Sequence, residues 1–298
     1  MLDVRRMQVL RAVVSSGSVS AAAANLGYTP SAISQQLATL EREAGTPLLE
    51  KVGRGLRPTP AGTLLAERAE QIAEVLGSTE AELADIRAGR TGLLRMRFFH
   101  TASVGLIPPA VAKFRAEHPE VQLDLQMAEV GLLDDVAAGR ADLAIIVVGS
   151  QRPQRRGVRL VHLVDDPYRV VLPTSHPMVE QDCVDLAQLA AESWVNSAVT
   201  SDDVCSRLLR DAYASAGFTP RIALETDSTY SAQAFVAAGL GVALVPRLGL
   251  DVVHPEVVVR PLRNPEPVRH IHVAVRDTVA DRPATRTLLA TLAETARG

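Results

Sequence analysis

A run of small polar residues between positions 29 and 35 has the types and spacing of a hydrogen-bonding surface. Thr29 and Pro30 predict the start of a helix, because a hydroxyl caps the first turn and proline at the first position loses no hydrogen bond. The apolar face predicted for this helix is Ile33, Leu37, Leu40 and Ala44. The opposite face is small and uncharged: Ser31, Ser34, Gln35 and Ala38. Short hydroxyls and an amide suit close approach to a major groove, where glutamine pairs with adenine.

The neighbouring segments place this helix in a helix-turn-helix. An alanine-rich helix is expected to end at Leu26, and a three-residue turn leads into the helix that begins after Thr29. That second helix is expected to end near Ala44, because Gly45 is a typical C-terminal stop. Two helices joined by a short turn are equally typical of a piece of a helical bundle, so the pair alone does not decide between a DNA-binding motif and a bundle.

Basic residues on the next segment favour a nucleic-acid partner. Lys51, Arg54 and Arg57 have the spacing of a short two-stranded wing that presents cations to a phosphate backbone. Residues 1–66 hold seven Lys and Arg against four acids, a surplus of three positive charges, whereas the whole chain has a net charge of −3. The positive charge is therefore concentrated in the part that is predicted to read DNA.

The order of a first helix, the segment SVSAAAANLGYTPSAISQQLATLEREAGTPLL, the segment GRGLRPTPAG and a long helix resembles the LysR-type transcriptional regulators. The resemblance implies two groups of DNA contacts. The base-contacting group is Thr29, Pro30, Ser31, Ser34 and Gln35, and the phosphate-contacting group is Arg42, Lys51, Arg54 and Arg57. Typical members carry Leu-Phe-x-Arg where this chain has Leu48-Leu49-Glu50-Lys51, so a lysine point charge replaces a bidentate arginine contact.

A long helix is expected after the wing, because Thr59 and Pro60 repeat the capping pattern of the earlier helix. Apolar residues then recur at alternating spacings of four and three, which predicts a heptad seam for dimerisation. The seam is Leu65, Ala69, Ile72, Leu76, Thr79, Leu83 and Ile86. The alternative is an amphipathic helix that packs on its own domain. Acidic residues on the opposite face favour the dimer, whose two recognition helices would read a pseudo-palindromic site.

Length and composition bound the remainder. With 298 residues and 47% hydrophobic content, the chain is too long for one small domain. Residues 2–14 are amphipathic and no apolar run is long enough to span a bilayer, so we expect neither a signal peptide nor a membrane span, and a cytoplasmic location. Cys183 and Cys205 have no metal-binding spacing, and no disulfide is expected in a reducing compartment.

Strands and helices alternate beyond a predicted hinge at residues 87–92, which predicts an open α/β sheet. The expected strands of a first lobe are 93–98, 121–127 and 142–148, with helices at 103–117 and 132–138. The chain is expected to cross into a second lobe near residues 161–166 and to return near 265–270. Two lobes with two crossovers form a cleft, as in periplasmic solute-binding proteins. The resemblance implies the same layout for an effector domain.

A ligand in such a cleft is expected beyond the carboxyl ends of the strands, where helix N-termini offer free N–H groups to an anion. The candidates in the first lobe are Thr101, Ala102, Ser103, Glu129, Val130 and Val148, and those in the second are Asn196, Thr200, Ser201, Asp227 and Ser228. Each hydroxyl is also explained as an ordinary helix cap. Their coincidence in two lobes favours a site for a small carboxylate.

Other motifs suggest no chemistry. Gly239-Leu240-Gly241 follows a helix and precedes a strand, which is the reverse of a dinucleotide-binding turn, so we interpret it as a helix end. His270 and His272 alternate on one face of a strand, but the sequence places no third ligand beside them, so we predict no metal site and no cofactor. No catalytic set stands out, and we predict that the chain is not an enzyme.

The sequence therefore predicts three parts: a winged helix-turn-helix DNA-binding domain over 1–62, a linker and dimerisation helix over 63–90, and a two-lobed α/β effector domain over 91–298. Lobe I covers about 91–162 and 269–298, and lobe II about 163–268. The expected partners are double-stranded DNA, a small effector, further copies of the chain as a homodimer or homotetramer, and RNA polymerase. The alternative is a two-lobed binding protein or enzyme with an N-terminal helical dimerisation module.

Overall fold

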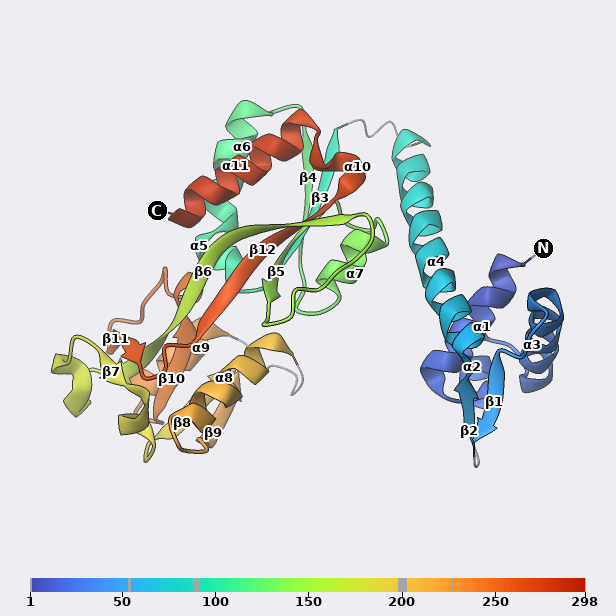
Figure 1. Cartoon of the computed structure of the whole chain (residues 1–298). Coiled ribbons are helices and arrows are strands. Elements are labelled where there is room, and N and C mark those ends of the chain that lie inside the picture. The colour runs from blue at the N-terminus through green and yellow to red at the C-terminus, as the bar shows by residue number, and fades with distance from the viewer. Residues whose placement is uncertain (1, 53–54, 88–91, 198–202, 227, 298) are drawn as a thin grey trace. The chain divides into compact units, whose positions relative to one another are not determined.

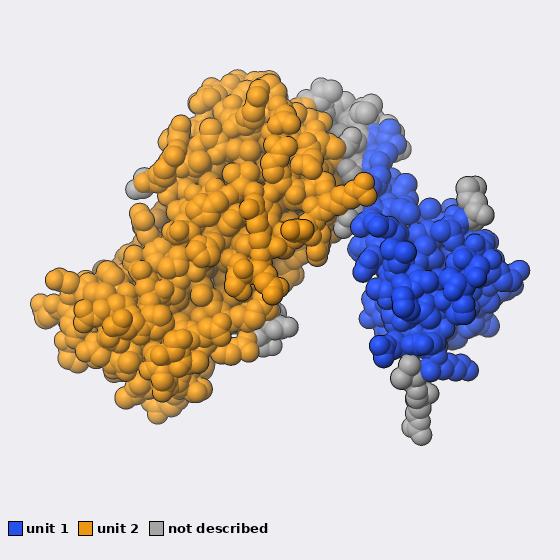
Figure 2. All heavy atoms as spheres, viewed as in Figure 1, with its two compact units in different colours: residues 1–88 blue, residues 89–298 orange. Residues whose placement is uncertain are grey.

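The computed structural model describes residues 2–52, 55–87, 92–197, 203–226 and 228–297. The chain divides into two compact units, residues 1–88 and 89–298, which Figure 2 shows in different colours. Four helices and a two-stranded sheet form the first unit: α1 (Val4–Ser16), α2 (Val19–Leu26), α3 (Pro30–Ala44), β1 (Leu49–Val52), β2 (Gly55–Pro58) and α4 (Pro60–Arg87). The predicted helix-turn-helix, wing and long helix are confirmed as elements (Figure 1).

Local signals set the ends of these helices as predicted. Thr29 caps α3, because its hydroxyl accepts from the backbone N–H of Ala32 at 3.2 Å. Gly27 and Gly45 follow α2 and α3 with φ of 70° and 68°, the left-handed conformation that glycine adopts without strain. The hydroxyl of Thr59 accepts from the N–H of Gly62 at 3.1 Å and so caps α4.

The first half of α4 packs inside its own unit. Ala69 is fully buried in the core that α1, α2 and α3 form, and Leu65 and Ile72 pack against that core. Leu76 and Leu83, further along the predicted seam, are 46% and 48% exposed. The interpretation as a helix that packs on its own domain therefore holds for the first half of α4, and dimerisation through the exposed half stays a prediction. The side chain of Ile86 lies outside the described part of the chain.

Lobe I of the second unit has a sheet in the order β4-β3-β5-β12-β6. Its strands are β3 (Leu93–Phe98), β4 (Gln122–Met127), β5 (Leu143–Val148), the first half of β6 (Val158–Pro173) and β12 (Val268–Arg276). Its helices are α5 (Ala102–Gly105), α6 (Ile107–Glu117), α7 (Leu132–Ala137), α10 (Asp277–Ala280) and α11 (Pro283–Arg297). Its core combines Met96, Ile145 and Ile271 on the sheet with Phe114 and Leu288 on the helices.

Lobe II is built on the second half of β6, which pairs with β10 (Val242–Pro246) and β11 (Val257–Arg263). Beyond β10 lie β8 (Ser193–Ser197) and β9 (Arg221–Thr226), and β7 (Val184–Asp185) pairs with β11. The helical segments are α8 (Val204–Ser215), α9 (Thr229–Ala237), η1 (Pro177–Glu180), η2 (Leu186–Leu189) and η3 (Arg247–Gly249). Trp194 is fully buried beneath α8, against Tyr213.

The first crossover is a continuous strand, whereas the return is the short segment between β11 and β12. β6 pairs with β12 in lobe I up to Pro167 and with β10 in lobe II from Tyr168 onward. The chain returns to lobe I at the start of β12. The prediction placed the crossing near residues 161–166 and the return near 265–270, but it did not identify the long strand that makes the crossing.

Two further details differ from the sequence prediction. The helix expected over 103–117 is two helices, because the chain breaks at Leu106 and α6 begins at Ile107, directly before two prolines that favour a first helical turn. Strand β11 was missed because Pro261 argues against a strand, although proline is tolerated where its missing N–H costs no ladder bond. Among the described helices, none is long and apolar enough to cross a membrane.

Candidate DNA-binding surface and lobe junction

The outward face of α3 matches the surface that the sequence predicts. Ser31, Ser34 and Gln35 are exposed, while Ile33, Leu37 and Leu40 are buried beneath them. The Ser34 hydroxyl donates to the carbonyl of Pro30 at 2.9 Å, which leaves its lone pairs directed outward. Within the described residues the Gln35 amide has no side-chain partner, so both its donor and its acceptor are available. Thr29 and Pro30, at the start of the helix, are exposed too.

The predicted phosphate contacts are distributed over more than one face. Arg42 donates to the Thr39 hydroxyl at 2.9 Å, which holds it along the exposed side of α3. In the wing, Arg57 lies opposite Glu50 and Lys51 lies opposite Leu56. Directly paired residues share a face and neighbours alternate, so Lys51 and Arg57 lie on opposite faces of the wing. Arg54 lies outside the described residues.

Part of the local positive charge stabilises the fold instead of facing a ligand. Arg6 pairs with Glu43 and donates to Gln36 at 3.1 Å, which ties α1 to α3. Arg11 pairs with Glu70 at 2.7 Å, which ties α1 to α4. Such part-exposed pairs contribute about 0–1 kcal/mol each, so their main effect here is that these two arginines are already neutralised.

Side-chain bonds to the backbone fix the position of the wing. Glu41 on α3 accepts from the N–H groups of Leu48 at 2.8 Å and Leu49 at 3.3 Å. The Thr59 hydroxyl donates to the carbonyl of Pro47 at 2.8 Å. Gly62 lies so close to Leu48 that a Cβ would approach its carbonyl oxygen to 1.9 Å, so only glycine fits there. The wing is therefore held on α3 and α4 together.

One predicted effector residue of lobe I, Thr101, contacts a buried arginine that the sequence analysis missed. Thr101 is buried, and its hydroxyl accepts from Nη2 of Arg269 at 2.9 Å instead of capping α5. Nε of Arg269 donates to Asp166 Oδ2 at 3.0 Å, and Nη2 contacts the same oxygen. We call the set Phe99, Thr101, Asp166, Tyr168, Cys205 and Arg269 the lobe junction.

The lobe junction is closed by aromatic and backbone contacts. The Arg269 guanidinium lies over the rings of Phe99 at 5.2 Å and Tyr168 at 5.6 Å. Asp166 also accepts from the N–H of Leu248 at 3.0 Å, which brings η3 of lobe II onto the crossover strand. The side chains of Arg269 and Asp166 are only 5% and 1% exposed. The junction therefore contains a desolvated ion pair, and Asp166 joins that pair to lobe II through the N–H of Leu248.

Burial determines the protonation of the junction. Burial opposes the charge of Arg269, but Tyr168 and Asp166 outweigh it and raise the pKa of the guanidinium, which stays protonated. Burial raises the pKa of Tyr168 well above its usual value. Burial also raises the pKa of the Cys205 thiol, while Arg269 beside it works in the opposite direction. At neutral pH the raised pKa values keep Tyr168 and Cys205 neutral beside the charged guanidinium of Arg269.

The other predicted effector residues occupy varied places. Ala102 and Val148 are buried, Val130 is 70% exposed, and Asn196 is half-buried. Ser228 serves as the cap of α9, where its hydroxyl accepts from Ser231 at 3.2 Å. Thr200, Ser201 and Asp227 lie outside the described residues. Burial makes Ala102 and Val148 unsuitable for side-chain contact with a ligand.

Ser103 and Glu129 meet at one backbone unit. The Ser103 hydroxyl donates to the carbonyl of His100 at 2.6 Å, and Glu129 Oε1 accepts from the N–H of His100 at 2.8 Å. These bonds hold the turn between β3 and α5. Thr101, whose hydroxyl accepts from Arg269, lies in this turn. Both predicted residues therefore lie beside the lobe junction, and both already have partners within lobe I.

The lobes also meet tightly at two glycines. A Cβ at Gly249 would lie 3.0 Å from Cγ2 of Thr229 and 3.2 Å from Cγ2 of Thr101. A Cβ at Gly105 would approach the carboxylate of Asp251 to 2.7 Å. Because α5 belongs to lobe I and η3 to lobe II, these contacts set how closely the lobes approach.

The strand pairing brings together a third group of side chains. The sequence analysis found no third metal ligand beside His270 and His272, and this is wrong for His270. The imidazole of His270 lies 2.8 Å from Asp165 Oδ1, and that of His162 lies 2.9 Å from the same oxygen. The ligand atoms of His162, Asp165 and His270 all lie within 4.8 Å of one another.

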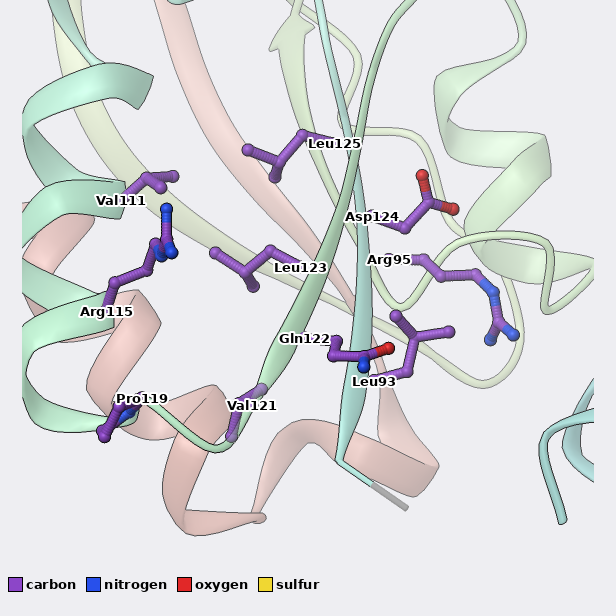
Figure 3. A pocket seen from close by; sticks show the side chains of 10 residues that line it. All are labelled: Leu93, Arg95, Val111, Arg115, Pro119, Val121, Gln122, Leu123, Asp124 and Leu125. Atoms are coloured by element: carbon purple, nitrogen blue, oxygen red, sulfur yellow. The ribbon is translucent and has the colours of Figure 1, made fainter. Parts of the chain in front are cut away.

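A cavity of about 790 Å³ lies elsewhere on lobe I, between α6 and the edge strand β4 (Figure 3). Figure 3 shows Leu123 and Leu125 directed towards Val111 and Arg115 on α6. Its described lining includes none of the predicted effector residues. The cavity therefore follows the open edge of the sheet and belongs to a different part of lobe I from the junction.

Comparisons with known proteins match both units. Residues 4–63 match the family described as "Bacterial regulatory helix-turn-helix protein, lysR family", and residues 87–297 match "LysR substrate binding domain". The probable HTH-type transcriptional regulator LrrA of Synechococcus elongatus is 28% identical over 99% of this chain and 98% of its own length. The HTH-type transcriptional regulator CbbR of Xanthobacter flavus is 31% identical over 81% of this chain and 72% of its own. The full-length CbnR structure with its target DNA has a TM-score of 0.54 at 22% identity, covering 99% of each chain.

Proposed function

Because the chain belongs to the LysR family of transcriptional regulators, we propose that α3 reads its operator in the major groove while the wing holds the phosphate backbone. The observation that carries the proposal is the exposed, uncharged face of Ser31, Ser34 and Gln35 above a buried core. A helix exposed only for solubility usually carries Glu and Lys there. Members of this family are regulators and not enzymes, so binding and its control are the function to test.

The test compares two adjacent glutamines. Gln35 is exposed and its amide has no partner among the described residues, whereas Gln36 accepts from Arg6 at 3.1 Å and ties α3 to α1. On a site selected from random DNA by binding, Gln35→Ala should cost about 1–3 kcal/mol, with little loss on unselected DNA. Gln36→Ala should leave the ratio of selected to unselected affinity unchanged. Equal losses on both DNAs for Gln35→Ala would remove its base-reading role.

We further propose that a small effector binds beside the lobe junction and changes how the lobes meet. Arg269 and the Thr101 hydroxyl lie there, and the Ser103 hydroxyl would donate to the effector in place of the His100 carbonyl that it now contacts, which supports an effector with a carboxylate. Such an effector would compete with Asp166 for Arg269, because the pair is already formed. Effector binding would thereby loosen or reset the contact between β6, β12 and η3.

A ligand screen tests the effector proposal. Small carboxylates are added to the full-length protein, and a ligand at 100 times its dissociation constant should add about 2.7 kcal/mol of stability. Ser103→Ala should keep operator affinity without the effector but weaken effector binding by about 1.5–3 kcal/mol, because a charge-assisted hydrogen bond is lost. A wild-type response in this variant would place the effector elsewhere.

Assembly and location complete the proposal. Leu76 and Leu83, exposed along α4, support a homodimer, and the family resemblance supports a homotetramer of such dimers. A two-fold assembly would bind a pseudo-palindromic operator in the cytoplasm, where chromosomal DNA is accessible. RNA polymerase is the partner expected of a DNA-bound regulator, and we assign no surface to it.

A further inference from the structure

His162, Asp165 and His270 form a compact cluster on the face of β6 and β12 that is opposite to the lobe junction. Asp165 Oδ1 lies 2.9 Å from Nε2 of His162 and 2.8 Å from Nδ1 of His270. The three side chains are 53%, 58% and 52% exposed, so solvent and ions reach them.

Strand register produces this cluster. His270 pairs directly with Asp165, and His272 pairs with His162 after a register shift between Ile271 and His272. Neighbouring residues on a strand point to opposite faces, so Asp166 and Arg269 enter the junction while Asp165 and His270 face away from it. Both strands lie inside the sheet, with β5 and β10 as further neighbours, and this holds the ligands on a rigid frame.

The donor set is selective. Two imidazoles and one carboxylate suit Zn²⁺ and related first-row ions, whereas Mg²⁺ and Ca²⁺ prefer sites made of oxygen alone. Two atoms bonded to one zinc ion at about 2.0–2.2 Å lie at most about 4.4 Å apart. The three ligand atoms lie within 4.8 Å of one another, so only a small side-chain adjustment is needed to bind one ion. The exposure of the cluster leaves room for water at the remaining positions.

A third histidine, His272, supports the frame. The ring of His272 packs edge-on against that of His162 at 5.1 Å between centroids, and its Nδ1 bonds to the carbonyl of His270 at 3.3 Å. A ring held in this way restricts the rotation of its neighbour, as outer-shell partners of metal ligands do. His272 itself is only 9% exposed, so it is much less accessible to solvent than the three proposed ligands.

We propose that His162, Asp165 and His270 bind one divalent transition-metal ion, with Zn²⁺ as its best representative. The site is independent of the effector proposal, because it faces away from the junction. A metal there would bridge the two strands that connect the lobes, directly beside the residues that form the buried ion pair. The regulator would then carry a second input site on the outside of its crossover.

A titration of the full-length protein with Zn²⁺ tests the site, read by calorimetry in a buffer that does not chelate metals. We expect one ion per chain. His270→Ala and His162→Gln should each weaken binding by at least about tenfold, since the loss of even outer-shell partners costs that much. The matched control is His118→Gln, because His118 and Glu120 form the same kind of pair at 3.1 Å and have Thr287 as third neighbour instead of a ligand.

Two outcomes would overturn the proposal. One is that His270→Ala and His162→Gln bind Zn²⁺ with the affinity of the wild type. Unchanged melting temperatures in the absence of metal would show that both variants fold. The other concerns the two cysteines, Cys183 and Cys205. A thiolate-to-metal charge-transfer band on titration with Co²⁺ would assign the ion to a cysteine, whereas only weak visible bands are expected from the proposed ligands.

Discussion

At the scale of single residues, the buried pair of Asp166 and Arg269 has a large energetic consequence. The pair is desolvated, bonded to Thr101, and placed between two aromatic rings. Two buried charges stabilise the fold little more than apolar side chains of the same volume would, but the loss of one partner leaves the other uncompensated. The pair therefore specifies how β6 and β12 meet, and the loss of one partner should lower the free energy of unfolding.

We expect Asp166→Asn to lower the free energy of unfolding by about 3–5 kcal/mol, because it leaves the Arg269 charge buried without its partner. Denaturant unfolding with EDTA present measures the change. The neighbouring substitution Asp165→Asn is the control, since Asp165 is 58% exposed and should cost less than about 1 kcal/mol. Equal effects of the two substitutions would show that the buried pair is not the source of the loss.

At the scale of elements, the long helix and the lobe contacts each combine two functions. Helix α4 packs through Ala69 into the core of its own unit, while Leu76 and Leu83 remain exposed. Helix α5 and η3 join the lobes where a Cβ at Gly249 would be crowded by the methyl groups of Thr229 and Thr101. A change of assembly would therefore act on the exposed half of α4, and a change of lobe closure would act on the contact between α5 and η3.

The exposed half of α4 should carry the dimer contact. Leu76→Asp with Leu83→Asp introduces charge into the seam and should dissociate the protein to monomers, as sedimentation velocity would show. Val75→Asp is the control, because Val75 is 64% exposed and flanks the seam, where coiled coils carry charged residues. Wild-type sedimentation of the double variant would exclude this half of α4 from the interface.

Closure of the lobes should depend on Gly249. Gly249→Ala places a methyl group against Thr101 and Thr229, and an overpacked contact of this kind costs about 1–3 kcal/mol. Thr101→Ser removes the clashing Cγ2 and keeps the hydroxyl that accepts from Arg269. Thermal unfolding of both single variants and the double variant should therefore show partial recovery. Strictly additive losses would mean that the contact with Thr101 does not limit closure.

At the scale of the whole molecule, charge separates the DNA-binding unit from the rest. The chain has a net charge of −3, yet residues 1–66 have a positive surplus, and two of their seven cations, Arg6 and Arg11, form internal pairs. Few cations remain for phosphate, so we expect each of them to have a measurable share in the salt dependence of binding.

Arg57→Ala should weaken binding to selected and unselected DNA alike. Each lost phosphate contact should make the slope of log affinity against log salt concentration shallower by about 0.9. Affinities at several salt concentrations provide the slope, and Arg11→Ala is the control because Arg11 pairs with Glu70 at 2.7 Å. An unchanged slope for Arg57→Ala would remove Arg57 from the phosphate contacts.

The sequence by itself determined the elements whose signals are local. The caps at Thr29 and Thr59, the stops at Gly27 and Gly45, and the outward face of α3 each depend on residues within a few positions of one another. The alternation of strands and helices was sufficient to predict two lobes and both crossovers. Such features follow from backbone preference and periodicity, which the chain carries at every position.

Tertiary structure alone decided which distant residues meet. Asp166 and Arg269 are separated by 103 positions, and their pairing depends on the register of β6 against β12. One shift of that register brings His162 beside Asp165 and His270, which periodicity on a single strand cannot reveal. In the same way, the two halves of the α4 seam look alike in sequence. Packing against α1 buries Ala69 and leaves Leu76 exposed. Burial depends on which surfaces the fold brings together, and the sequence of one helix does not show this.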